Sequence, residues 1–520
     1  MEKQTTTLII LDGWGVPQKK CRSSAISAET APNFYGWLKE YPNTELAASG
    51  EAVGLFKGQE GNSEAGHLNI GAGRIVKQDT LYVSDSINDG SFFKNSAFQQ
   101  ALHHVKKYDT AVHLMGLMSN HNSAHSCPEH LYALLDLFKR EGIKKVFLHL
   151  FTDGRDSGQH DAMSHLKKLE GHFHGNEKIA TVMGRFYAMD RNKVWERTEA
   201  AYNAIVTGKG KKAADAEGAI AMAYNSGESD EFISPTVIFE KGKPVGTVKD
   251  NDVVFFFNLR SDRARQLTKA FVQDDFGRIN PGSFHRPIKP KNTRFVAMTD
   301  FGPDLPGIFT AFPSRDVQNS LVAALCPRRQ LYVAESEKFA HVTYFLNGGF
   351  AQHFCDEQWV KIESDHLKDF EKKPEMKSAE IADYVTKALE RREFDFIAVN
   401  FANADMVGHT GNLEAGKKAV SAIDKALGKI VAETIKNDGI CVITADHGNA
   451  EEMVNPRTGE VDSEHSINPV PLIIVASKKA RAKYKLKKKL RKGKLCDVAP
   501  TILKLLGAKV PAEMTGKSLF

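Results

Sequence analysis

The chain has 520 residues, with 70 Lys or Arg against 64 Asp or Glu and a formal net charge of +6. Its 42% hydrophobic and 26% charged residues are typical of a globular protein and exclude a disordered, collagen-like or coiled-coil chain. The length predicts about two to four domains. Eleven of the 17 residues Lys478–Lys494 are basic, and subtracting these charges from +6 leaves −5. The excess positive charge is therefore local.

Short apolar runs along the chain predict β-strands, namely Thr7–Leu11, Val146–Phe151, Val253–Phe257, Phe396–Val399, Cys441–Thr444 and Val470–Val475. Amphipathic stretches between them, such as Ala379–Arg391 and Ala415–Ile435, predict helices. Strands that alternate with helices predict an α/β fold with a mainly parallel sheet and helices on both of its faces. Reactive groups in such sheets gather at the carboxyl ends of the strands.

Candidate metal ligands fall into two separate regions of the sequence. Asp12 and the loop around Ser63 lie near the start, whereas the other candidates lie after residue 400. The intervening chain carries a distinct, arginine-rich set. We therefore expect one domain built from residues 1–77 and 313–520, with a second α/β domain inserted at 78–312.

The candidate ligands share positions at predicted strand ends, tight turns or polar loops. Alone, each has an ordinary interpretation, as a turn or cap residue or a solvated histidine. Together they form an oxygen and nitrogen donor set without thiolate, which favours Mn²⁺, Zn²⁺ or Mg²⁺. These residues are Asp12, Asp405, His409, Asp446, His447 and His465.

Ser63 lies in a glycine-flanked turn that leads into a predicted helix. One interpretation is a helix N-cap. The other is a nucleophile, which a serine becomes only when a base or a metal activates it. A divalent cation would also neutralise the charge of an incoming phosphate, so serine with two metals indicates phosphoryl transfer.

Arginines of the central region stand beside glycines and aromatic residues. Guanidinium groups bind carboxylate and phosphate bidentately, so this set predicts a small acidic substrate. The alternative, ion pairs that tie loops together, is credible for Arg191, Arg197 and Arg265. The set comprises Arg155, Arg185, Arg191, Arg260 and Arg263, and Lys338, ahead of the strand-like run Val342–Leu346, offers a further cation.

The six cysteines are scattered singly, with no CxxC pair. In a chain of this length they predict reduced thiols and a cytoplasmic location, with Cys441 as a small buried apolar residue. No apolar run approaches the roughly 18 residues that a membrane span needs.

Six long motifs resemble those of cofactor-independent phosphoglycerate mutases. They are Asp12–Gly15, Gly61–Arg74, Asn400–Gly411, Asp446–Asn449, Asn468–Leu472 and Glu513–Leu519. The resemblance implies a member of the alkaline phosphatase superfamily with a phosphatase-like metal domain and an inserted transferase domain. It further implies a monomer with two Mn²⁺ ions that interconverts 3- and 2-phosphoglycerate through phosphoserine, without 2,3-bisphosphoglycerate.

The resemblance also assigns a role to each matching residue. It makes Asp405, His409 and His465 the ligands of one metal, and Asp12, Ser63, Asp446 and His447 those of the other. Ser63 would be the nucleophile, Asp156 the acid/base, and Lys338 the cation that stabilises the transferring group. The glycerate or phosphate would be held by His125, Arg155, Arg185, Arg191, Arg260 and Arg263.

One loop departs from the family pattern. Where the family has Ser-Asp-Gly-Gly-Val-His-Ser-His, this chain reads Ser-Asn-His-Asn-Ser-Ala-His-Ser-Cys over Ser119–Cys127, with one extra residue and no paired glycines. The family histidine therefore matches His125, with His121 as the alternative.

Two rival functions can be set against this interpretation. A phosphatase or a phosphopentose mutase on the same scaffold would not explain the arginine set. A nucleic-acid or membrane binder would act through Lys478–Lys494, but Tyr484 is the only aromatic residue there, so no stacking platform accompanies the charge. We expect a small-molecule phosphoglycerate as partner, with neither nucleic acid nor membrane.

Overall fold

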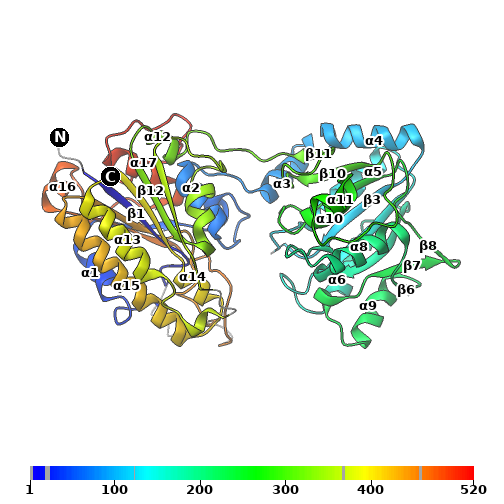
Figure 1. The fold of residues 1–520 in the computed structure, drawn as a ribbon, viewed down its shortest axis with the longest axis horizontal. Helices are drawn as coiled ribbons and strands as arrows, with labels where there is room; N and C mark the ends of the chain where they lie inside the picture. The colour runs from blue at the N-terminus through cyan, green and yellow to red at the C-terminus, as the bar shows by residue number, and fades with distance from the viewer. Residues whose placement is uncertain (1–3, 18–23, 122, 366–368, 456–458) are drawn as a thin grey trace. The chain divides into compact units, whose positions relative to one another are not determined.

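The computed structural model describes residues 4–17, 24–121, 123–365, 369–455 and 459–520. Its contacts divide the chain into two compact units (Figure 1). Unit 1 is Met1–Gln78 with Arg315–Phe520, and unit 2 is Asp79–Ser314. The domain boundaries expected from the sequence, after residues 77 and 312, lie one and two residues before the boundaries of these units, which fall after residues 78 and 314.

Unit 1 is built on an eight-stranded sheet, counted over the described residues. Its central strands are parallel to one another. The sheet continues on one side with β16, β2 and β17, and β16 is antiparallel to both of its neighbours, β15 and β2. In spatial order the strands are β13 (Glu357–Ile362), β12 (Gln330–Glu335), β14 (Phe396–Phe401), β1 (Thr6–Leu11), β15 (Ile440–Thr444), β16 (Val470–Ala476), β2 (Asn43–Ala47) and β17 (Gly493–Lys494).

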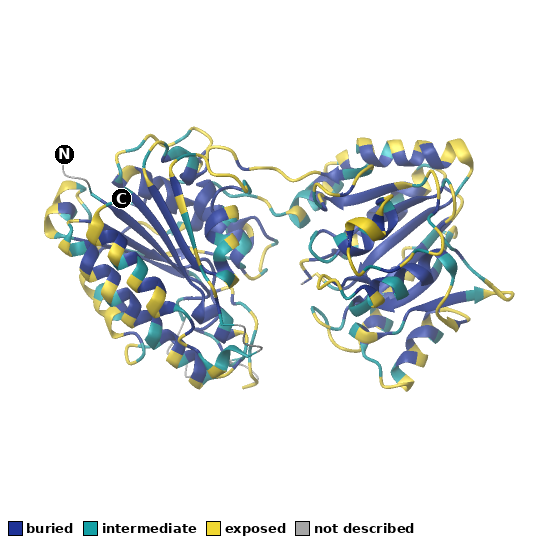
Figure 2. Ribbon diagram, viewed as in Figure 1, coloured by how far each residue is buried: buried dark blue, intermediate teal, exposed yellow. Residues whose placement is uncertain are grey.

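Every residue of β1, β14, β15 and β16 is buried, so both faces of this sheet are covered (Figure 2). Helix α15 packs on α1 and α13, and a second group packs around α2. Asn412 caps α15 by accepting the Ala415 amide at 3.1 Å. The helices are α1 (Pro32–Glu40), α2 (Ser63–Ala72), α12 (Leu321–Ala324), α13 (Ser378–Arg391), α14 (Asn403–Gly408), α15 (Leu413–Lys436), α16 (Lys478–Lys483) and α17 (Val498–Leu505).

Unit 2 contains a second, mostly parallel sheet, of nine strands in the part of the chain that is described. Only the β5–β7 and β7–β8 pairings are antiparallel among those present. The strands are β11 (Ile308–Phe312), β10 (Arg294–Thr299), β9 (Val253–Phe256), β3 (Val112–Met118), β4 (Val146–Thr152), β5 (Glu177–Gly184), β7 (Thr236–Glu240) and β6 (Lys211–Ala213) in spatial order, with β8 (Lys243–Pro244) beside β7.

Strand β9 shows how this sheet separates two hydrophobic cores. Val253 and Phe255 belong to one cluster, whereas Val254 and Phe256 belong to the other. Alternate side chains of a strand point to opposite faces, so helices cover both sides. The helices are α3 (Asp79–Asn88), α4 (Ser96–Tyr108), α5 (Pro128–Arg140), α6 (Ala162–Glu170), α7 (Arg185–Ala188), α8 (Trp195–Thr207), α9 (Ala216–Asn225), α10 (Arg265–Val272) and α11 (Phe276–Ile279).

The six predicted strands and the two predicted helices are all present, and the α/β class is confirmed. The run Val342–Leu346 is a correction, because His341–Phe345 forms a π-helical turn rather than a strand. Its apolar residues pack on α2 and β12, and this burial overrides their β propensity.

The lysine-rich segment Lys478–Lys494 forms α16 and a mostly exposed stretch that follows it in the chain. No helix among the described residues combines the length and apolarity that crossing a bilayer requires.

The cysteines provide a second correction, because Cys326 and Cys355 form a disulfide with their Cα atoms 5.9 Å apart. The two residues precede the neighbouring parallel strands β12 and β13, and this pairing brings them together. Because the cysteines occur one at a time along the sequence, their positions alone do not reveal which two will pair. Cys127, Cys441 and Cys496 are free and buried, as expected for Cys441, and Cys21 lies outside the described residues.

We expect the disulfide to stabilise unit 1. Replacing both partners, Cys326→Ser with Cys355→Ser, should lower the free energy of unfolding by about 2–4 kcal/mol, because the open loop gains entropy when unfolded. Urea unfolding of the oxidised proteins measures this difference, which should vanish in reductant. Thiol titration of denatured, oxidised protein should find no more than four of the six cysteines. Six reactive thiols would contradict the prediction.

Candidate active site

Neighbouring parallel strands of unit 1 bring three carboxylates to one edge of the sheet. Asp12 follows β1 directly, and Asp446 lies two residues after β15. Asp405 lies on α14, which begins two residues after β14. Since β1 pairs in parallel with both β14 and β15, these three strand ends share one edge. All three carboxylates are buried.

Gly13 lets the turn after β1 approach α14 closely. Its φ is +72°, in the left-handed region, and a Cβ at this position would lie 2.8 Å from the Asp405 Cα. A larger residue would therefore push α14 away. The close approach places the carboxylates of Asp12 and Asp405 around a common centre.

Ser63 is the first residue of α2 and is not the N-cap, so the N-cap interpretation was wrong. The cap is Asn62, whose side chain accepts the Ala65 amide at 2.9 Å. The Ser63 hydroxyl donates to Asp12 Oδ1 at 3.1 Å and lies 3.0 Å from His447 Nε2. Because Asn62 caps the helix, the Ser63 hydroxyl is directed into the carboxylate cluster.

Lys338 supplies a buried cation at the centre of this cluster. Its Nζ donates to Asp12 Oδ1 at 2.7 Å, to Asp405 Oδ2 at 2.6 Å and to Ser63 Oγ at 2.7 Å. Burial alone would lower the pKa of Lys338, but the surrounding carboxylates raise it above its usual value. Burial likewise raises the pKa of Asp12 and Asp405, yet Lys338 holds both well below their usual range. The site is thus built to stabilise positive charge.

His447 responds to the same carboxylates. Burial lowers its pKa, but Asp446, Asp12 and Asp405 together raise it to about 10. An imidazole that holds a proton so firmly lies in a strongly negative environment. A metal cation bound there would meet the same favourable field.

Among the residues that the structure describes, two groups of side chains have the geometry to hold a metal ion. Asp405, His447 and His465 form one group, and Asp12, Asp446 and His447 form the other, with ligand atoms within 4.8 Å of one another. His409 Nε2 lies 3.3 Å from Asp405 Oδ1 and 3.2 Å from His465 Nε2. The structure therefore gathers all the metal residues expected from the sequence, with His447 central to both groups.

The chemistry of these groups fits divalent metal ions. The Oδ2 atom of Asp446 is buried and accepts no hydrogen bond from the described residues, although His67 Nδ1 lies 3.2 Å from it. A buried carboxylate oxygen without a hydrogen bond is stabilised when a cation binds it. Carboxylate oxygens and imidazole nitrogens without thiolate suit Mn²⁺ or Zn²⁺.

Several polar residues that orient this cluster were missed as functional residues. Asn400 donates to Asp12 Oδ2 at 2.7 Å, and Asn449 donates to Asp405 Oδ1 at 3.0 Å. His67 Nδ1 lies 3.2 Å from Asp446 Oδ2 and 2.9 Å from the Ser63 carbonyl oxygen. All three lie within the quoted motifs, so their proximity to predicted ligands in the sequence was the available signal.

In unit 2, a second group of predicted residues gathers at the carboxyl ends of parallel strands. Arg185 follows β5, and its Nη1 donates to Asp153 Oδ1 at 2.5 Å and to Asp156 Oδ2 at 2.9 Å. Asp156 also accepts the Ser123 hydroxyl at 2.8 Å. Burial raises the pKa of Asp156, but Arg185 brings it below its usual value, so its carboxylate is ionised at neutral pH.

Arg263 marks an excess of positive charge in this group. It makes no ion pair with any described residue, and its Nη1 donates only a long bond, 3.4 Å, to the Met189 carbonyl. Burial, with repulsion from Arg191, Arg185 and Arg155, lowers its pKa to about 10. Arginines that repel one another are stabilised when an anion binds between them.

Ion pairs account for some of the arginines, as the alternative interpretation held. Arg191 pairs with Asp262 at 2.7 Å, Arg197 pairs with Asp190 at 3.0 Å, and Arg265 pairs with Asp304. Arg197 and Arg265 are thereby structural. Arg191 also takes part in the repulsion at Arg263 and so faces the anion-binding group.

The altered loop places its two histidines in different surroundings. His125 is buried, and burial with the charges of Arg185 and Arg260 lowers its pKa to about 3. His121 is exposed and pairs with Glu129 through Nε2 and Oε1, 2.6 Å apart. Two arginines of the group, Arg185 and Arg260, therefore act on His125, whereas His121 is paired with Glu129.

Two family models match the chain over ranges that follow the two units. The model described as BPG-independent PGAM N-terminus matches residues 83–303. The model described as type I phosphodiesterase / nucleotide pyrophosphatase matches residues 314–501.

Similar proteins extend the match over the full length. The chain is 45% identical to a 2,3-bisphosphoglycerate-independent phosphoglycerate mutase of Clostridium acetobutylicum, over 100% of both chains. It is 48% identical to mutase 2 of Methanosarcina barkeri, over 98% of each. A crystal structure of Leishmania mexicana phosphoglycerate mutase at low cobalt concentration aligns with a TM-score of 0.78 at 27% identity, covering 100% of this chain and 98% of that one. The chain therefore belongs to the 2,3-bisphosphoglycerate-independent phosphoglycerate mutase family.

Proposed function

We propose that this protein interconverts 3-phosphoglycerate and 2-phosphoglycerate through a phosphoserine at Ser63, without 2,3-bisphosphoglycerate. The contacts of the Ser63 hydroxyl carry this proposal, since Lys338 Nζ, Asp12 Oδ1 and His447 Nε2 all lie within 3.1 Å of it. A serine held by a buried ammonium among carboxylates is placed for attack on an anionic phosphoryl group.

In the first step, the Ser63 oxygen attacks phosphorus, and the bond from phosphorus to the glycerate 3-oxygen breaks. The hydroxyl proton passes to the carboxylate cluster, where Ser63 already donates to Asp12, and the departing 3-oxygen takes up one proton to leave as a hydroxyl. Lys338 neutralises charge on the transferring group, and its raised pKa keeps it protonated.

In the second step, the 2-hydroxyl of glycerate attacks the phosphoserine, and the Ser63 oxygen leaves. Asp156 is ionised at neutral pH and takes the proton of the attacking hydroxyl, while the departing Ser63 oxygen takes up one proton and becomes a hydroxyl again. We assign the glycerate carboxylate and phosphate to Arg155, Arg185, Arg191, Arg260, Arg263 and His125. Holding glycerate between the steps lets the phosphoryl group return to the other hydroxyl of the same molecule.

We assign one divalent ion to Asp405, His409 and His465, and a second to Asp12, Ser63, Asp446 and His447. Bound ions would lower the pKa of the serine hydroxyl and neutralise phosphate charge. Mn²⁺ is the proposed metal because the donors are oxygen and nitrogen. His447 lies in both geometric groups, so it could serve either ion.

The remaining expectations are also part of this proposal. A self-contained set of site residues within one chain supports a monomer. A central metabolic substrate supports a cytoplasmic location. The cysteine argument for that location no longer applies, because the chain carries a disulfide. The absence of a nucleic-acid or membrane partner stays a prediction.

We expect the wild-type protein to bind two equivalents of Mn²⁺ and the variant His409→Ala about one. Each ion binds only the folded protein, so Mn²⁺ at 100 times its dissociation constant should add about 2.7 kcal/mol of stability per site. Metal analysis of gel-filtered protein and thermal unfolding measure these effects. His353→Ala, which replaces an exposed histidine outside the site, is the matched control. Two equivalents retained by His409→Ala would refute its assignment.

The variant Ser63→Ala should lower kcat by at least about 10³-fold, because no other nucleophile replaces the hydroxyl. Purified protein is given 3-phosphoglycerate and Mn²⁺, with no bisphosphoglycerate present, and 2-phosphoglycerate is measured. Ser226→Ala, at an exposed serine, serves as the control. Mass spectrometry of quenched wild-type protein should find one phosphoryl group on Ser63. Release of inorganic phosphate in place of 2-phosphoglycerate would establish a phosphatase instead.

The two histidines of the altered loop can be distinguished by substitution. His125→Ala should lower kcat/KM by roughly 10- to 100-fold, the typical effect of losing a hydrogen bond to a charged group. His121→Ala should change it by less than about three-fold, because His121 pairs with Glu129. Steady-state kinetics of both variants decides between them. The reverse pattern would transfer the role to His121.

A further inference from the structure

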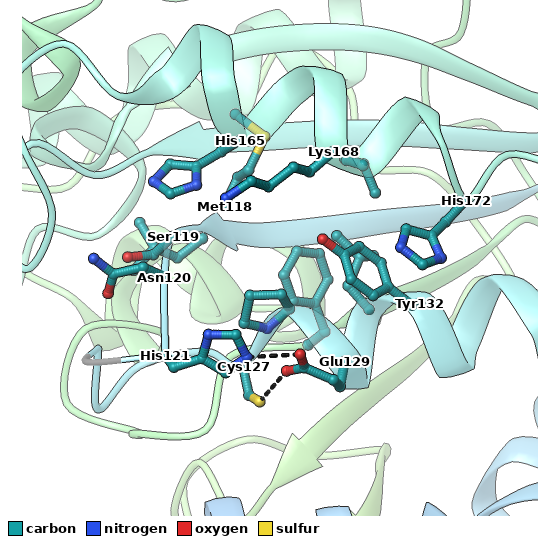
Figure 3. Close-up of a pocket in the computed structure, with 15 residues that line it drawn as sticks. Met118, Ser119, Asn120, His121, Cys127, Glu129, Tyr132, His165, Lys168 and His172 are labelled. Atoms are coloured by element: carbon teal, nitrogen blue, oxygen red, sulfur yellow. Dashed lines mark hydrogen bonds and ion pairs between the residues drawn. The ribbon is translucent and has the colours of Figure 1, made fainter. Parts of the chain in front are cut away.

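A cavity of about 330 Å³ lies in unit 2 between α5, α6 and the carboxyl end of β3 (Figure 3). None of the residues assigned to the substrate lines it. The lining residues that matter here are Ser119, Tyr132, His165 and Lys168, over a floor that includes Phe257. The cavity is therefore separate from the arginine group that we assign to phosphoglycerate.

Aromatic rings and apolar side chains form most of the walls of this cavity. Leu117, Leu131 and Leu169 line it together with the Phe257 ring. Tyr132 stacks on His172 with ring centroids 3.7 Å apart and planes 12° from parallel. Surfaces of this kind favour a ligand with a flat apolar body.

Two nitrogen groups in the cavity lack partners among the described residues. Lys168 makes no ion pair with them, and its side chain extends toward His165 (Figure 3). The Nε2 atom of His165 is buried and has no hydrogen-bond partner there. An ammonium beside an unsatisfied imidazole nitrogen is a site for an anionic oxygen.

Among the described residues that line the cavity, Glu129 alone is acidic, and it does not neutralise these groups. Glu129 Oε1 pairs with His121 Nε2 at 2.6 Å, and Oε2 accepts the Cys127 thiol at 3.0 Å. Both oxygens are thus engaged on the opposite side of the cavity from Lys168 (Figure 3). The polarity of the cavity is therefore cationic at one end.

We propose that this cavity is a second ligand site, which takes a small molecule with a flat apolar body and one anionic group placed at Lys168 and His165. Ser119 connects this site to the substrate residues. Its hydroxyl donates to Asp153, whose other oxygen accepts Arg185 Nη1 at 2.5 Å. The ligand therefore acts as an effector of substrate binding, and this second part rests on the proposed function.

The binding site is tested with 1-anilinonaphthalene-8-sulfonate, a fluorescent aromatic sulfonate, on the full chain. We expect saturable binding that Lys168→Glu weakens at least ten-fold, because the sulfonate loses its cation. Lys167→Glu is the matched control, since this neighbouring exposed lysine makes the same charge change on α6 without lining the cavity. Equal affinities in the two variants, or complete displacement of the probe by 3-phosphoglycerate, would overturn the proposal.

The effector role is tested separately by the KM for 3-phosphoglycerate. Saturating probe should change this KM at least two-fold in the wild-type protein and not in Ser119→Ala, which should still bind the probe. An unchanged wild-type KM would overturn the effector role. Because probe binding is read without turnover, a protein that lacks mutase activity would contradict the proposed function and not the ligand site.

Discussion

The ammonium of Lys338 among buried carboxylates is the interaction on which unit 1 depends. Its three contacts, all within 2.7 Å, hold Asp12, Asp405 and Ser63 around one point. Carboxylates cannot stay ionised in a buried site without compensating cations. Removing this lysine alone would leave like charges facing each other. The same excess of negative charge makes the site receptive to metal ions, so stability and chemistry have one electrostatic origin.

Unit 2 has a similar, mostly parallel sheet, but the group of side chains at its edge carries an excess of positive rather than negative charge. Parallel strands again deliver polar residues to one sheet edge, but there the guanidinium groups exceed their acidic partners around Arg263. One unit therefore favours cations and the other favours anions. A phosphorylated acid in a metal-dependent reaction requires both environments, since its charge must be held while a phosphoryl group moves.

Strand positions could be predicted because they depend on local patterns of apolar residues, and the proximity of Asp12, Asp405 and Asp446 followed from their places at or near the ends of such runs. The disulfide could not, because Cys326 and Cys355 meet only through the pairing of β12 with β13. The helical turn at His341–Phe345 was missed because its burial against α2 overrides β propensity. Asn62 rather than Ser63 caps α2, and adjacent candidates of equal propensity cannot be ranked without coordinates. The cavity beside Lys168 likewise joins separate helices and leaves no contiguous motif.

The discontinuity of unit 1 has a consequence for synthesis on the ribosome. Strand β1 pairs with β14 from Thr6 against Phe396, a separation of 390 residues. At about 5–20 residues per second, β1 waits roughly 20 to 80 s for this partner. All six of its residues are buried in the finished sheet, so an apolar strand stays unpaired meanwhile. Unit 2 is continuous and can fold during that interval. The nascent amino-terminal segment is therefore where a chaperone would be needed first.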